Sequence, residues 1–298
     1  MSVEPDTRTQ AVNQERGVVE PALAGQFPEL RILTPRTAYV TDSLGLRAGP
    51  FFSTPQVTEA LHGEALEVLE DLTDGWAWGR TLHDGYLGYI HRHQVESLSL
   101  VAPIQPITVQ VPRTHLYAAP SVKAAILGEL GRGATLSTLD PEPAQHGEYL
   151  WWRVEYQGRE AYLHAAATQP GKRDLESFVA GYLHTPYVWG GRSAWGLDCS
   201  GLSQLWAGQD AAGKSLLPRD ADQQQAATTP VERPEAGDLA FFEGHVGVML
   251  DAGRMLHANA THLRVTVERL GEGEYGRKLA AGLLGFGRIG GLDSRGPE

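Results

Sequence analysis

The sequence has almost none of the residues that would build a disulfide framework or a membrane segment. Its 298 residues include a single cysteine, Cys199, so no intramolecular disulfide can form. No apolar run reaches the roughly 18 to 20 residues that cross a bilayer, and residues 1–20 lack the apolar core of a secretory signal. We therefore expect a cytoplasmic protein without a membrane partner.

Positive charge is also scarce. Lysine and arginine number 25 against 36 aspartate and glutamate residues, which gives a formal net charge of −11. Nucleic acids and anionic membranes bind proteins that carry an excess of positive charge, so neither partner is expected. The 11 histidines are scattered without a His-Glu-x-x-His pattern, and we expect neither a metal nor another cofactor.

What the chain does contain is an internal repeat. The tripeptide Pro-Arg-Thr at 35–37 recurs at 112–114, and Gly-x-x-x-Tyr at 85–89 recurs at 158–162. In each copy a tryptophan-rich segment precedes the second motif, and short alternating apolar runs are broken by Gly, Asp and Pro. This pattern is typical of small antiparallel barrels.

The repeat divides the chain. We predict one barrel over residues 30–101 and a second over 107–168, joined by proline-rich linkers at 103–106 and 169–172. Residues 1–29 are polar and aperiodic, and we interpret them as a mobile or loosely docked extension.

Residues 170–298 change character. Two helices are expected first and a run of strands afterwards, which favours an α+β domain. The predicted helices cover 173–183 and 202–213. The predicted strands cover 238–242, 245–250, 254–259, 265–268 and 283–289.

Cys199 stands between a glycine-rich loop and the predicted helix, inside Asp-Cys-Ser-Gly. The thiolate is the attacking form of cysteine, and the positive end of a helix dipole favours it. Free N–H groups at such a terminus can also hold an oxyanion. A lone cysteine is more often a buried structural residue, but this position favours a nucleophile.

Two histidines offer the base. His245 opens an apolar strand, and the next strand carries His257 beyond the segment Asp-Ala-Gly at 251–253. A three-residue hairpin loop there sets Gly247 against His257, so that His257 lies diagonally across from His245 on the same face. His257 would then orient the ring of His245. A two-residue turn would instead place the histidines on opposite faces, and Asn259 and His262 are weaker candidates for the orienting role.

Several spaced motifs together resemble the NlpC/p60 family of papain-like cysteine peptidases. They are Pro-Tyr-Val-Trp-Gly-Gly at 186–191, Asp-Cys-Ser-Gly at 198–201, Gly-Asp-Leu-Ala-Phe-Phe at 237–242 and Gly-His-Val-Gly at 244–247. Two SH3-like barrels ahead of such a domain resemble its subgroup of γ-D-glutamyl-L-diamino acid endopeptidases. The resemblance implies an α+β, papain-like catalytic domain preceded by two small all-β SH3-like barrels.

The resemblance also implies an activity. The substrate would be a peptidoglycan stem peptide with a free N-terminal L-Ala, cleaved between γ-D-Glu and the diamino acid during cell-wall recycling or turnover. The acidic residue of Arg219-Asp220 would hold the ammonium, helped by Tyr86 of the first barrel. Without the resemblance, Asp220 reads equally well as a plain helix N-cap. The remaining residues at pocket positions of the family are Tyr187, Trp189, Asp198 and Ser200.

Two other functions fit parts of this pattern. One is a cell-wall peptide-binding protein whose peptidase domain is inactive, which the intact set of Cys199, His245 and His257 disfavours. The other is a thiol amidase or acyltransferase on the same fold. Acyl transfer to lipid would favour an apolar cleft, whereas Asp220 and Tyr86 are polar.

Overall fold

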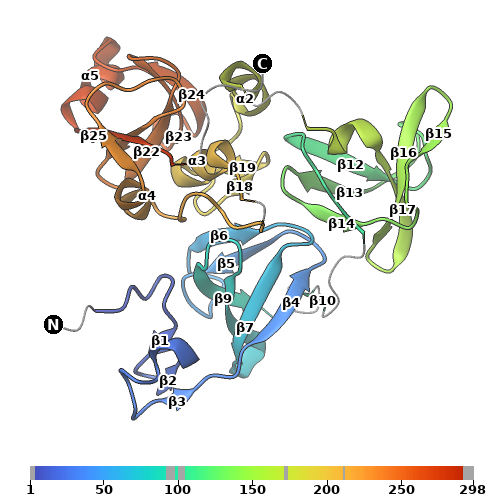
Figure 1. The fold of residues 1–298 in the computed structure, drawn as a ribbon, viewed down its shortest axis with the longest axis horizontal. Helices are drawn as coiled ribbons and strands as arrows, with labels where there is room; N and C mark the ends of the chain where they lie inside the picture. The colour runs from blue at the N-terminus through green and yellow to red at the C-terminus, as the bar shows by residue number, and fades with distance from the viewer. Residues whose placement is uncertain (1–3, 92–97, 100–104, 171–173, 211, 291–298) are drawn as a thin grey trace.

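The structure is a computed structural model that describes residues 4–91, 98–99, 105–170, 174–210 and 212–290. Figure 1 shows two small β units, one blue to cyan and one green, beside an α+β unit in yellow to red. The predicted fold class is therefore confirmed. The predicted domain end at residue 101 and the linker positions 103, 104, 171 and 172 lie outside the described residues.

The N-terminal segment packs firmly on the first β unit. Its short strands β1 (Val12–Asn13), β2 (Val18–Val19) and β3 (Arg31–Ile32) form a three-stranded sheet. Ala11 and Val18 are fully buried in one apolar cluster with Trp78 of the barrel. The prediction of a mobile or loosely docked extension is wrong, because a few apolar side chains spaced through a polar segment are enough to anchor it.

The first β unit is a seven-stranded sheet in the order β10-β4-β7-β8-β9-β5-β6. Its strands are β4 (Arg36–Val40), β5 (Leu44–Arg47), β6 (Gln56–Ala60), β7 (Ala65–Asp71), β8 (Trp76–Thr81), β9 (Leu87–His91) and β10 (Leu98–Ser99). Residues 82–86 form the turn between β8 and β9, which carries Tyr86.

The second β unit consists of a five-stranded sheet in the order β13-β12-β17-β16-β15 and a two-stranded sheet of β11 and β14. Its strands are β11 (Pro106–Thr108), β12 (Arg113–Tyr117), β13 (Ile126–Gly131), β14 (Thr135–Ser137), β15 (Ala144–His146), β16 (Tyr149–Tyr156) and β17 (Arg159–His164). The repeated Pro-Arg-Thr motif starts β4 and β12, and the repeated Gly-x-x-x-Tyr motif runs into β9 and β17. The two units touch where the N–H of Thr135 donates to the carbonyl of His62 at 2.8 Å.

The α+β unit is built on a six-stranded sheet in the order β20-β25-β21-β22-β23-β24. Its strands are β20 (Thr229–Val231), β21 (Leu239–Phe242), β22 (His245–Met249), β23 (Arg254–Asn259), β24 (Arg264–Arg269) and β25 (Leu283–Arg288), with a hairpin of β18 (Arg192–Ser193) and β19 (Gly196–Leu197). The helices are α2 (Leu175–Tyr182), α3 (Cys199–Ala207), α4 (Ala221–Ala227) and α5 (Gly273–Ala281).

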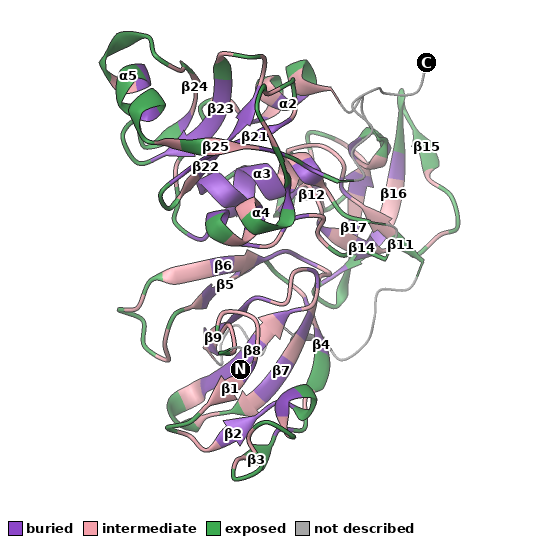
Figure 2. Ribbon diagram, turned by 60° about the vertical axis from the view of Figure 1, so that its left-hand side comes forward, coloured by how far each residue is buried: buried purple, intermediate pink, exposed green. Residues whose placement is uncertain are grey.

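Two helices differ from expectation. Helix α3 starts at Cys199 rather than at residue 202, because the carboxylate of Asp198 caps it by accepting the N–H of Gly201 at 2.7 Å. It ends at Ala207 because Gly208 has a φ of 77°. Helix α5 was not expected, since two glycines lower the helix propensity of its largely polar sequence. Figure 2 shows α3 as a buried element.

None of the helices in the described part of the chain has the length and apolarity needed to cross a membrane.

Candidate active site

The predicted nucleophile lies at the first position of α3, where the helix meets the sheet. Cys199 is 6% exposed and packs in one apolar cluster with Val246 and Val248 of β22. Burial raises the pKa of the Cys199 thiol, and the backbone N–H groups of Val246 and Ser200 oppose that rise without reversing it. Since Val246 directly follows His245, this contact brings the thiol to the strand that carries the predicted base.

The predicted register of the histidine hairpin is confirmed. Val248 pairs with Leu256 and Met249 with Met255, and continuing that register sets Gly247 opposite His257. His245 Nε2 and His257 Nδ1 lie 2.8 Å apart. Fully buried, His257 is suited to orient the ring of His245.

The weaker candidates for the orienting role lie farther out. The side-chain nitrogen of Asn259 is 3.3 Å from His257 Nε2, on the side away from His245. His262 pairs with Glu268 at 3.2 Å.

Burial determines the protonation states of Cys199, His245 and His257. It raises the pKa of the Cys199 thiol to about 12, with a further contribution from the charge of Asp198. It lowers the pKa of His245 to about 4 and that of His257 to about 3. At neutral pH the site therefore holds a protonated thiol and a neutral imidazole, which suits proton transfer during attack.

A buried arginine forms hydrogen bonds with the residues that flank Cys199. Arg219 is 1% exposed, and its two terminal nitrogens donate to the carboxylate of Asp198 at 3.0 and 2.6 Å. One of them also donates to Ser200 Oγ at 2.8 Å. Asp198 accepts the N–H of Gly190 at 2.9 Å as well. The buried polar atoms thus hold the Gly-rich loop and the start of α3 in place.

Three of the predicted pocket residues take part in these hydrogen bonds. Asp198, Ser200 and Arg219 all have partners within the protein, so positioning the nucleophile accounts for their burial. Their direct contact with a substrate stays a prediction.

The other predicted pocket residues line the loop before α3. Tyr187 is half-buried, and burial, followed by the nearby Cys199 and Asp198, raises its pKa to about 12. Trp189 is 59% exposed and offers an open aromatic face. Both come from the same turn as Gly190, whose left-handed φ of 77° lets the loop pass close to the backbone of Gln56 in the first β unit.

Tyr86 and Asp220 meet across the boundary between the first β unit and the α+β unit. The hydroxyl of Tyr86 donates to Asp220 Oδ2 at 2.9 Å. Burial raises the pKa of both groups, and the charge of Asp220 raises that of Tyr86 further. Asp220 is also the N-cap residue of α4, so the N-cap interpretation of this residue is confirmed, whereas its contact with a substrate amine stays a prediction.

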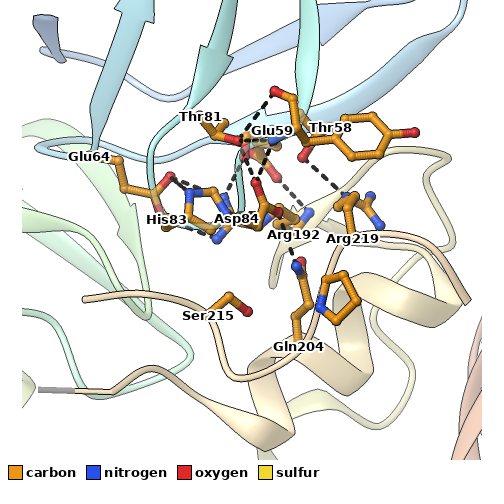
Figure 3. Close-up of polar contacts among 12 residues, drawn as sticks. Thr58, Glu59, Glu64, Thr81, His83, Asp84, Arg192, Gln204, Ser215 and Arg219 are labelled. Carbon is orange, nitrogen blue, oxygen red and sulfur yellow. Dashed lines mark hydrogen bonds and ion pairs between the residues drawn. The ribbon is translucent and has the colours of Figure 1, made fainter. Parts of the chain in front are cut away.

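The turn that carries Tyr86 is held from below by polar contacts, which Figure 3 shows converging between the two units. Gln204 of α3 donates to Asp84 Oδ2 at 3.0 Å, and His83 Nε2 lies 3.1 Å from the same oxygen. Because Asp84 is two residues from Tyr86, the helix that begins with Cys199 also positions the tyrosine.

A second part of this interface is a buried ion pair. Arg192 of β18 donates to the two carboxylate oxygens of Glu64 at 3.0 and 3.1 Å, and its backbone N–H donates to Glu59 at 2.8 Å. Sequence reasoning had no role for Arg192, since nothing local marks the partner of a buried charge.

Sequence reasoning also missed Arg8. Its guanidinium donates to Asp220 Oδ2 at 3.0 Å and to Asp222 at 2.8 Å. No local pattern predicts this contact, because Arg8 and Asp220 are 212 positions apart.

Two family profiles match the sequence. That of the NlpC/P60 family matches residues 184–283, and that of the bacterial dipeptidyl-peptidase SH3 domain matches residues 46–95. The chain is 30% identical over 213 residues to the γ-D-glutamyl-L-lysine dipeptidyl-peptidase of Bacillus subtilis, covering 66% of this chain and 68% of that protein. It is 25% identical over 263 residues to dipeptidyl-peptidase 6 of Lysinibacillus sphaericus, covering 82% of this chain and 96% of that one.

A solved structure shares the fold. An NlpC/P60 family protein from Bacillus cereus superposes with a TM-score of 0.67 at 22% identity, covering 85% of this chain and 99% of that one. The likeness over nearly the full length of that protein shows that the fold of this chain is that of a whole solved NlpC/P60 protein.

Proposed function

Because the chain belongs to the NlpC/P60 family, we propose that it is a cysteine endopeptidase that cleaves the bond between γ-D-Glu and the diamino acid of peptidoglycan stem peptides carrying a free N-terminal L-Ala. The proposed setting is cell-wall recycling or turnover. The names of two relatives, one a γ-D-glutamyl-L-lysine dipeptidyl-peptidase, support the bond and the release of a dipeptide.

The observation that carries the proposal is the hydrogen-bonded pair of Tyr86 and Asp220, which directly follows the arginine that holds the residues flanking Cys199. A carboxylate and a hydroxyl 2.9 Å apart form a site for an ammonium group. Arg219 connects this pair to the catalytic helix, since it precedes Asp220 and bonds the residues on both sides of Cys199. An N-terminal amine held at Asp220 would thus be connected, through Arg219, to the residues that position the thiol.

The proposed chemistry needs no further group. The thiol of Cys199 attacks the γ-carbonyl carbon of D-Glu while His245 takes its proton. The tetrahedral oxyanion collapses, the C–N bond breaks, and His245 returns the proton to the leaving amine of the diamino acid. Water activated by His245 then hydrolyses the thioester, which releases L-Ala-γ-D-Glu and the free thiol.

The test is peptide cleavage by the full chain. L-Ala-γ-D-Glu-L-Lys and its meso-diaminopimelate counterpart are incubated with the wild type and with Cys199→Ala, and the released dipeptide is measured by mass spectrometry. We expect release by the wild type and none by the variant. Release by both proteins, or by neither, would contradict the proposal.

A further inference from the structure

Arg8 occupies the same carboxylate oxygen that the proposed function assigns to the substrate. Asp220 Oδ2 accepts the hydroxyl of Tyr86 at 2.9 Å and Nη1 of Arg8 at 3.0 Å. A carboxylate oxygen offers about two lone-pair positions, so Tyr86 and Arg8 together occupy Asp220 Oδ2. A substrate ammonium that binds there has to replace one of the two donors.

The approach of Arg8 is built into the fold. The carbonyl of Arg8 accepts the N–H of Leu87 at 2.7 Å, directly beside Tyr86. On the other side, Gln223 of α4 donates to Asp6 at 2.8 Å. The N-terminal segment is therefore pinned to both walls of the subsite, and the buried residue Ala11 anchors it to the barrel close by.

Of the two donors, Arg8 is the one that can leave. Tyr86 is 8% exposed and fixed in its turn, whereas the side chain of Arg8 is 36% exposed. A cavity of about 760 Å³ lined by Arg8 and Tyr86 gives the guanidinium room to move.

The guanidinium of Arg8 keeps other hydrogen-bond partners when it leaves Asp220. Its Nε and Nη2 both bond Asp6 at 2.9 Å, and Nη1 bonds Asp222 at 2.8 Å. Three carboxylates share this one cation, so the cluster keeps a negative excess that a second cation would reduce. The site thus accommodates an incoming ammonium at Asp220 while Arg8 stays on its other two partners.

We propose that Arg8 is a specificity-determining residue of the amine subsite, an internal cation that the substrate's ammonium must displace from Asp220. This inference rests on the proposed function. It makes the affinity for free-amine peptides weaker than the Asp220–Tyr86 pair alone would provide, and it leaves peptides without the amine unaffected.

The test compares steady-state kinetics on L-Ala-γ-D-Glu-L-Lys and its N-acetylated form. For Arg8→Ala we expect the KM of the free-amine peptide to fall about two- to fivefold, the scale of a partly exposed charge pair, with little change for the acetylated peptide. Arg8→Lys keeps the cation and should stay close to the wild type. Arg31→Ala, an exposed arginine of the same segment that pairs with Glu70, is the matched control, and thermal denaturation checks that each variant is folded.

The outcomes distinguish displacement of Arg8 from a general opening of the cleft and from failure of the proposed function. An unchanged or higher KM for the free amine in Arg8→Ala overturns the displacement, and so does an equal fall for both peptides, which would indicate general opening of the cleft. Arg8→Gln, which keeps most of the side chain, repeats the test should the alanine variant be unstable. If the wild type cleaves neither peptide, the proposed function fails instead.

Discussion

Replacing Asp220 by asparagine should remove most of the selectivity for a free N-terminal amine. The change keeps the size of the side chain and its ability to accept from Tyr86 and to cap α4, but it deletes the negative charge. Arg8 retains Asp6 and Asp222 as partners, so the variant leaves no isolated charge. The fold is therefore expected to survive.

The magnitude follows from the surroundings of the carboxylate. A hydrogen bond to a charged group contributes about 1.5–3 kcal/mol. The side chain of Asp220 is 28% exposed, and discounting for solvent screening leaves about 1–2 kcal/mol. That range corresponds to about a five- to thirtyfold loss in kcat/KM for the free-amine peptide, while the N-acetylated peptide should change little.

The assay measures kcat/KM for both peptides with the wild type and with Asp220→Asn. The ratio of the two values cancels differences in active enzyme concentration, so it reports recognition of the amine alone. An unchanged ratio would refute the assignment of the ammonium to Asp220. A parallel loss on both peptides would instead indicate that the residue acts through α4 and the fold.

Three further predictions test the site and its support. Because the pKa of His245 is lowered to about 4, kcat/KM should stay nearly flat from pH 7 down to about pH 5.5 and fall below that as the base is protonated; a half-maximal value near the ordinary histidine pKa of about 6.5 would contradict this. His257→Leu should lower kcat about a hundredfold with little change in KM, because His245 loses its orienting partner, whereas His262→Ala should retain activity; equal losses would argue against the triad. Arg192→Met leaves the buried carboxylate of Glu64 without its arginine partner, while the backbone N–H of residue 192 still donates to Glu59, and should lower the free energy of unfolding in urea by about 3–5 kcal/mol; Arg153→Met, which breaks an exposed ion pair, is the control, and similar midpoints for the two variants would refute the role of the buried pair.

Much of the architecture follows from local sequence patterns. The repeat of Pro-Arg-Thr and Gly-x-x-x-Tyr predicts two related β units, because each copy fills its own small core. The hairpin through residues 251–253 sets the register that brings His245 and His257 to one face, since turn length determines which residues of two strands are opposite. Glycine and aspartate around Cys199 mark the loop and the helix start.

The errors lie where local signals are weak. Helix α5 was missed because its glycines oppose helix formation and tertiary contacts of Leu279 with the sheet decide it. The few apolar residues of the N-terminal segment have no period, so the sequence does not predict its packing on the barrel. In both cases burial against a distant surface outweighs local propensity.

The sequence by itself determined the kind of domain and predicted the candidate nucleophile, the candidate base and its partner, because these depend on residue types at short spacing. Only the tertiary structure decided how the units meet. Gln204 donates to Asp84, Arg192 pairs with the carboxylate of Glu64, and Arg8 donates to Asp220. Such pairs join residues separated by more than 100 positions, and an ionic contact leaves no periodic trace along the chain. Their geometry arises only when the barrel is packed against the catalytic helix.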